Sequence, residues 1–184
     1  MKKIIVLIIS LVLLTSVLTA CNTSGGGTND NNESNETGVN LVIGANALKF
    51  VHNGVSITPN AEAAPIIASL GDPVEYVESP SCGFEGMDKT YKYNGFIIDT
   101  VTMKGVEYIY YIQLVNDTVE TAEGAYINMT PDEVAAIYEG KFKVEGYNVI
   151  VAFENGELRF FFKNNVCTSI SYSATTIPNL EEGK

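Results

Sequence analysis

The sequence contains one histidine, His52, and no tryptophan. A hydrolytic triad needs a nucleophile, a base and an orienting group, so a histidine base would have to be His52, and no serine stands in a nucleophile-elbow sequence. Gly25, Gly26 and Gly27 form the only glycine run, which lies in a polar segment and not in a phosphate-binding loop. We therefore expect His52 to be structural or exposed, and we predict no catalytic residue, cofactor or metal.

Positive charge is also scarce. The chain has 11 lysine and arginine residues against 22 aspartate and glutamate residues, and its formal net charge is −11. Nucleic-acid binding needs clustered Lys and Arg opposite the phosphate backbone, so this composition argues against a nucleic-acid partner. Solubility explains such an acidic surface, and attraction to a basic protein or to cations is the alternative.

A long apolar run occurs only at the N-terminus. Lys2 and Lys3 precede the largely apolar residues 4–17, and the small-residue sequence Leu18-Thr19-Ala20-Cys21 follows. The run is interrupted by three hydroxyl residues and is shorter than the roughly 18 to 20 apolar residues of a membrane span. This pattern predicts a cleaved signal peptide over residues 1–20.

The sequence Leu18-Thr19-Ala20-Cys21 resembles the lipobox of bacterial lipoproteins. The resemblance implies that Cys21 carries a diacylglycerol, with palmitate-type chains, and becomes the first residue of the mature protein. More than one acyl chain holds a protein stably on a membrane. We therefore expect a lipid anchor in the cell membrane, on its extracytoplasmic face; an ordinary signal peptide with an unmodified cysteine is the alternative.

Residues 21–40 are rich in Asn, Gly, Ser and Thr and contain little that could be buried. We predict a flexible tether, because such a segment cannot offset the entropy cost of ordering, and the ligand pattern of an EF-hand calcium loop is absent. Residues 41–184 suit one domain, with halves at about 41–120 and 121–184. Removal of residues 1–20 leaves 9 basic and 22 acidic side chains, a formal charge of about −13.

Two cysteines remain besides Cys21, and an exported compartment permits disulfides. Cys82 and Cys167 are 85 residues apart, so a bond between them would stabilise the fold by about 4.5 kcal/mol in the simple loop model. We predict this disulfide; two free thiols or a metal site are the alternatives.

Two segments carry helix signals. Thr130-Pro131-Asp132-Glu133 has the pattern of a capping box before a helix that stops at Gly140, and a segment starting near Thr58 runs to Leu70. Alternating apolar residues and turn pairs predict strands at 48–52, 55–57, 89–93, 96–102, 106–115, 147–154, 157–163 and 166–173. The expected fold is α+β: a tandem repeat of a short helix followed by an antiparallel β-meander, with the helices packed on one face of the sheet.

This organisation behind a lipobox resembles the beta-lactamase inhibitor proteins and related small envelope lipoproteins, over residues 58–173. The segment from Glu78 to Lys89 is also similar to uncharacterised Gram-positive lipoproteins. The first resemblance implies a tandem-repeat fold, and the second implies no known activity.

In the last predicted strand, Cys167 alternates with Val166, Thr168 and Ile170, which places it on the polar face. A bond to Cys82 would then pin a loop across the open side of the sheet. Two other predicted strands carry aromatic rings on both faces, so some rings should be exposed and could anchor a partner, although core packing also explains them. The candidate binding residues are Phe84, Tyr108, Tyr110, Tyr111, Arg159 and Phe161.

These observations predict a non-enzymatic binding module for a protein or an envelope component. Two alternatives stay open. One is a structural subunit of an envelope complex. The other is a hydrolase of envelope polysaccharide that uses two acids, for which the candidates are Glu85, Asp88, Asp99, Glu107, Asp117, Glu120 and Glu123.

Overall fold

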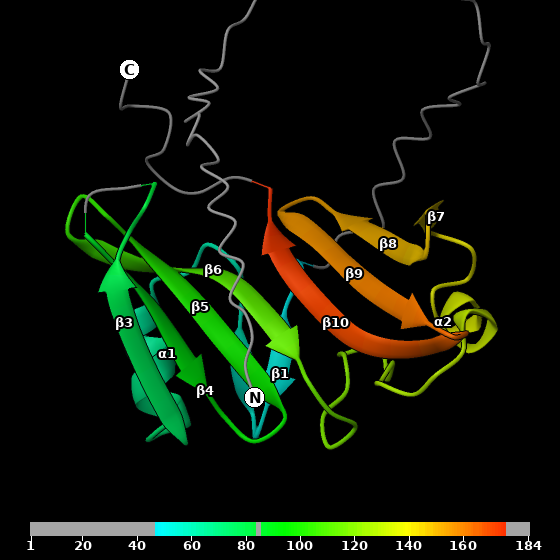
Figure 1. Ribbon diagram of the computed structural model, residues 1–184, viewed down its shortest axis with the longest axis horizontal. Helices are drawn as coiled ribbons and strands as arrows, with labels where there is room; N and C mark the ends of the chain where they lie inside the picture. The colour runs from blue at the N-terminus through cyan, green and yellow to red at the C-terminus, as the bar shows by residue number, and fades with distance from the viewer. Residues whose placement is uncertain (1–46, 84–85, 176–184) are drawn as a thin grey trace, which may run out of the picture. The chain divides into compact units, whose positions relative to one another are not determined.

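The computed structural model describes residues 47–83 and 86–175, which belong to one unit, Val39–Lys184. The expected signal peptide, Cys21, the tether, Phe84 and the candidate acid Glu85 lie outside the described residues. The described chain forms one eight-stranded antiparallel sheet and a separate two-stranded hairpin (Figure 1). The strands are β1 (Phe50–His52), β2 (Val55–Ile57), β3 (Glu75–Pro80), β4 (Met87–Lys92), β5 (Phe96–Met103), β6 (Val106–Leu114), β7 (Lys143–Glu145), β8 (Asn148–Phe153), β9 (Gly156–Lys163) and β10 (Val166–Ala174).

The large sheet has the strand order β3-β4-β5-β6-β10-β9-β8-β7. Strands β3 to β6 are hydrogen-bonded in chain order, as are β7 to β10. The two runs join where β6 pairs with β10, from Ile170 opposite Leu114 to Ser173 opposite Tyr111. Tight turns connect neighbouring strands, and their residues adopt positive φ; Asn164 and Asn165 between β9 and β10 are an example.

The two helices are α1 (Ala63–Leu70) and α2 (Pro131–Ile137). Helix α2 begins as predicted: Thr130 and Glu133 form a capping box and Pro131 occupies the first turn. Helix α1 begins five residues after Thr58, and Pro65 falls in its first turn, where a backbone N–H has no partner inside the helix. No helix in the described residues is long and apolar enough to cross a membrane.

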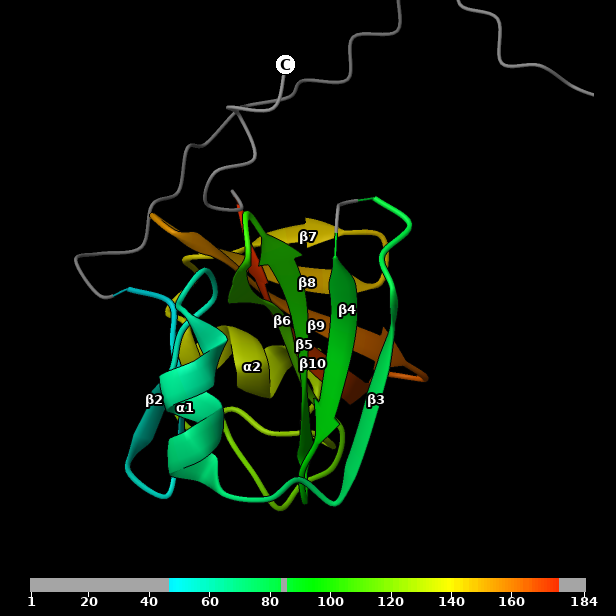
Figure 2. The ribbon, with the colours of Figure 1, turned by 90° about the vertical axis from the view of Figure 1, so that its left-hand side faces the viewer.

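The core lies between one face of the large sheet and the β1–β2 hairpin with the helices. Figure 2 shows α1 and the hairpin on the same side of β3 to β6. Phe50 of the hairpin is fully buried, 5.0 Å from the Phe96 ring and 5.9 Å from the Tyr172 ring. On the other half of the sheet, Tyr138 after α2 lies 5.5 Å from Phe160. We name this sheet surface the core face.

The predicted α+β tandem repeat is wrong. The described chain is mostly β, because strands β3 and β7 join the six large-sheet strands that were expected, and the helices have only 8 and 7 residues. Each helix buries one residue fully, Ala63 in α1 and Val134 in α2. The helices therefore form no layer of their own, and the sheet and hairpin supply most of the core.

The predicted disulfide is also absent. Both thiols are free, with Cys82 exposed and Cys167 buried. A β-bulge at Thr168 shifts the register between Cys167 and Ser169, so Cys167 points to the core face with Ile170 and Tyr172. Because simple alternation ignores such a bulge, it placed Cys167 on the wrong face.

Candidate functional site

The sheet surface opposite the core face carries the candidate site, and we name it the open face. Residues directly opposite each other in antiparallel strands point to the same side, so the register identifies its members. One row crosses five strands through Thr90, Asp99, Tyr111, Ser173 and Glu157. The open face thus has aromatic and acidic side chains over β4 to β6 and serines along β10.

A second β-bulge shapes the aromatic part of the open face. Asp99 pairs with Tyr111 and Thr100 pairs with Ile109, which leaves Tyr110 without a partner residue on β5. The extra residue lets Tyr111 face the open side, and Tyr110 is 44% exposed. Strict alternation would have placed these neighbouring rings on opposite faces of the sheet.

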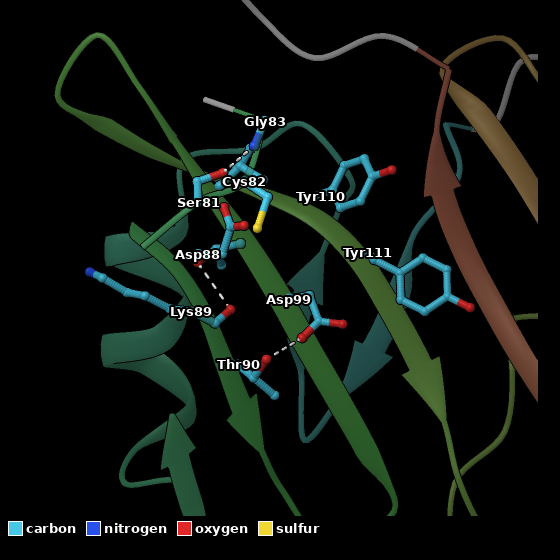
Figure 3. Close-up of a pocket in the computed structure, with 11 residues that line it drawn as sticks. Ser81, Cys82, Gly83, Asp88, Lys89, Thr90, Asp99, Tyr110 and Tyr111 are labelled. Carbon is cyan, nitrogen blue, oxygen red and sulfur yellow. Dashed lines mark hydrogen bonds between the residues drawn. The ribbon is translucent and has the colours of Figure 1, made fainter. Parts of the chain in front are cut away.

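Tyr110 and Tyr111 line a pocket of about 530 Å³ above β4 to β6. The loop after β3 forms its rim, where Gly83 N donates a hydrogen bond to Ser81 Oγ (Figure 3). The described lining residues are Ser81, Cys82, Gly83, Asp88, Lys89, Thr90, Asp99, Thr100, Val101, Tyr110 and Tyr111.

Two carboxylates belong to this pocket. Asp99 Oδ1 accepts a hydrogen bond of 2.6 Å from Thr90 Oγ1, which orients its carboxylate, and the Asp99 side chain points toward Tyr111 (Figure 3). Asp88 lies two residues from Thr90 on the same strand and face, which makes it a diagonal neighbour of Asp99; residues in such positions are about 7 to 8 Å apart, and their Cβ atoms are somewhat closer. Asp88 Oδ1 is buried and has no hydrogen-bond partner.

No family model matches this chain. No curated protein matches its sequence. Two crystal structures show a distant similarity to this chain. One is an extracellular protein containing a SCP domain from Bacillus anthracis str. Ames, with 13% identity and a TM-score of 0.45; the match covers 83% of this chain and 50% of that one. The other is the uncharacterized protein yfeY from Escherichia coli, with 11% identity and a TM-score of 0.40 over 69% of this chain and 95% of that one. This chain thus spans half the length of the first protein, and neither similarity assigns a function.

The pocket brings together Cys82 of the predicted disulfide with Tyr110 and Tyr111 of the predicted binding surface, and it also contains the candidate acids Asp88 and Asp99. Tyr108 lies on the open face opposite Val101, outside the described lining. Phe161 also lies on the open face, opposite Ser169 and Asn148 on the far half of the sheet. These residues therefore do not form one compact cluster.

Arg159 is held by acids of its own sheet. Its guanidinium lies 2.7 Å from Glu157 and 3.7 Å from Glu145. A hydrogen bond from the neighbouring Lys143 lowers the pKa of Glu145, and the positive charge of Arg159 lowers it further. Arg159 therefore stabilises local side-chain positions and is a weaker candidate anchor than the two tyrosines.

Asp88 and Asp99 were candidates only as members of a large set of acids. A local signal could have paired them: an Asn94-Gly95 turn places Tyr93 opposite Phe96, and counting outward places Thr90 opposite Asp99. The described residues contain no group of three His, Cys, Asp or Glu side chains that could hold a metal ion.

Proposed function

We propose that this protein is an extracytoplasmic lipoprotein, anchored to the cell membrane through Cys21, whose folded domain is a non-enzymatic binding module. It recognises a protein or an envelope component through the open face. The signal-like residues 1–20 and the lipobox-like sequence before Cys21 support the anchor.

The pocket at Tyr110 and Tyr111 is the observation that carries the binding role. Ligand sites in proteins are concave, have volumes of about 300 to 1,000 Å³ and combine aromatic surface with a few placed polar groups. This pocket has two aromatic rings, two carboxylates and hydroxyl groups within about 530 Å³. Tyrosine supplies a large contact area at a low entropy cost, which suits a recognition surface.

Site-specific photocrosslinking in the host cell tests the binding role. A benzophenone amino acid replaces Tyr110 in the full-length protein, and the matched control carries it at Val51, which is 42% exposed on the β1–β2 hairpin. We expect a discrete adduct with a protein or polysaccharide from position 110 and none from position 51. Equal labelling at both positions, or none at position 110, contradicts the proposal.

A hydrolase of envelope polysaccharide is a second candidate, because Asp88 and Asp99 share the pocket. Their diagonal positions on β4 and β5 place both carboxylates over one pocket, and glycosidases act through two such acids that flank the substrate. Release of reducing ends from purified envelope polysaccharide, abolished by Asp88→Asn and by Asp99→Asn, would establish this function and refute the non-enzymatic one. A stoichiometric adduct with one protein of a larger complex would instead favour a structural subunit.

A further inference from the structure

The charged groups that line the pocket are mainly acidic. Asp88 and Asp99 supply two carboxylates, and Lys89 is the only cation among the described lining residues. Lys89 Nζ lies 2.7 Å from Glu107 Oε2, and its side chain points away from both aspartates in Figure 3. The described lining therefore presents negative charge that its own lysine does not neutralise.

The hydrogen bonding of the two aspartates narrows the ligand class further. Asp99 has a donor inside the protein, Thr90, whereas Asp88 Oδ1 is buried without one. A buried acceptor without a donor is costly, so rotation of the Asp88 carboxylate toward an N–H donor that enters the pocket would remove this cost. A quaternary ammonium has no N–H and could not do so.

The tyrosines add a third requirement. A cation near the face of an aromatic ring is attracted by the ring quadrupole. Tyr110 and Tyr111 border the same pocket as the carboxylates, and the chain as a whole carries twice as many acidic as basic residues. A pocket lined by two carboxylates and two aromatic rings suits a ligand with an ammonium group on an apolar stem.

Resting on the proposed binding role of the open face, we infer that this pocket binds a primary alkylammonium group. The ammonium donates hydrogen bonds to Asp88 and Asp99, and its alkyl stem packs against Tyr110. A free diamine and a lysine side chain of a partner protein present the same chemistry.

Isothermal titration calorimetry on the full-length protein in detergent tests this inference with four probes. These are 1,5-diaminopentane, a peptide with one accessible lysine, the neutral isostere 1,5-pentanediol and tetramethylammonium. We expect binding of the two primary ammonium probes only, weakened several-fold between 50 and 500 mM NaCl by charge screening. Tighter binding of the diamine indicates a free amine as ligand, and tighter binding of the peptide indicates a lysine.

Substitutions locate the site. We expect Asp88→Asn and Asp99→Asn each to weaken binding about tenfold, and Tyr110→Leu to weaken it about threefold. Glu75→Gln is the matched control, because Glu75 is an exposed acid on the adjacent strand that pairs with Lys92 outside the pocket.

Several results overturn the inference. They are diol or tetramethylammonium binding as tightly as the diamine, binding by none of the four probes, and unchanged affinity in both aspartate variants. Alkylation of Cys82, an exposed thiol on the pocket rim, gives a second readout that does not depend on the variants folding. Saturating diamine should slow it, and an unchanged rate counts against the inference. A crosslink from position 110 would still support the binding role if every amine failed.

Discussion

Lys89 Nζ lies 2.7 Å from Glu107 Oε2 on the core face of the sheet. The two residues belong to β4 and β6, so this ion pair spans the intervening strand β5. Thr100 Oγ1 and Tyr91 OH donate to the other oxygen of Glu107, at 2.6 and 2.9 Å. Burial opposes ionisation of Glu107, but these hydrogen bonds outweigh it and lower its pKa. The same contacts hold the Lys89 ammonium away from Asp88 and Asp99.

Replacement of Glu107 by Gln should lower the free energy of unfolding at pH 7 by about 2 kcal/mol. The reason is that the largely buried carboxylate accepts hydrogen bonds from a charged lysine and two neutral hydroxyl groups, and a neutral amide accepts them more weakly. Since folding lowers the pKa of Glu107, its stabilising effect is complete above the ordinary glutamate pKa and is lost as pH falls through the lowered value. Urea denaturation at pH 7 and pH 3 measures both effects.

The difference between the Glu107→Gln variant and the native chain should therefore shrink at pH 3. Glu75→Gln serves as control, because it removes an exposed ion pair with Lys92 and should change stability by less than about 1 kcal/mol. An equal difference at both pH values would show that the charge of Glu107 is not what stabilises the fold.

The two domain thiols should react very differently. Burial raises the pKa of the Cys167 thiol to about 11, and its side chain is inaccessible, whereas Cys82 is exposed. Iodoacetamide at pH 8, followed by peptide mass mapping, should modify Cys82 in the native protein and Cys167 only after denaturation. Cys82→Ser is the control and should leave no reactive domain thiol. Recovery of a Cys82–Cys167 linked peptide without reducing agent would contradict the free thiols.

Gly156 cannot accept a side chain. A Cβ there would overlap with the carbonyl oxygen of Ser173 on the neighbouring strand β10, and it would lie 2.8 Å from Leu48 Cδ2. We expect Gly156→Ala to lower the free energy of unfolding by about 3 kcal/mol, because paired backbone must move apart. Gly105→Ala, in open space at φ +80°, is the matched control and should cost about 1 kcal/mol. Similar thermal melting midpoints for the two variants would argue against this close approach.

The lipid anchor is tested at Cys21. Cells fed radiolabelled palmitate should incorporate label into the native chain and not into Cys21→Ser, because serine has no thiol for the diacylglycerol. We expect the variant to lose stable membrane association as well, since that association requires the acyl chains. Cys82→Ser is the control and should keep the label. Label that persists in Cys21→Ser would refute acylation at this residue.

Local sequence signals located many of the elements. The Thr130–Glu133 capping box, the Asn164-Asn165 turn and most strand segments follow from contacts between residues close in the chain. Strand β3 escaped prediction because it is an edge strand whose six residues are all exposed, so it has no alternation of apolar and polar residues. Strand β7 escaped because three residues are too few for a pattern.

The sequence by itself determined the acidic composition, the signal-like N-terminus, the turns and the strands with clear alternation, because each depends on composition or on near neighbours. The tertiary structure decided to which side of the sheet each side chain points. Bulges at Tyr110 and Thr168 arise from pairing with distant strands, and each moves the side chains beyond it to the other side of the sheet. For this reason only the folded sheet could bring Tyr111 and Asp99 to one pocket and turn Cys167 into the core.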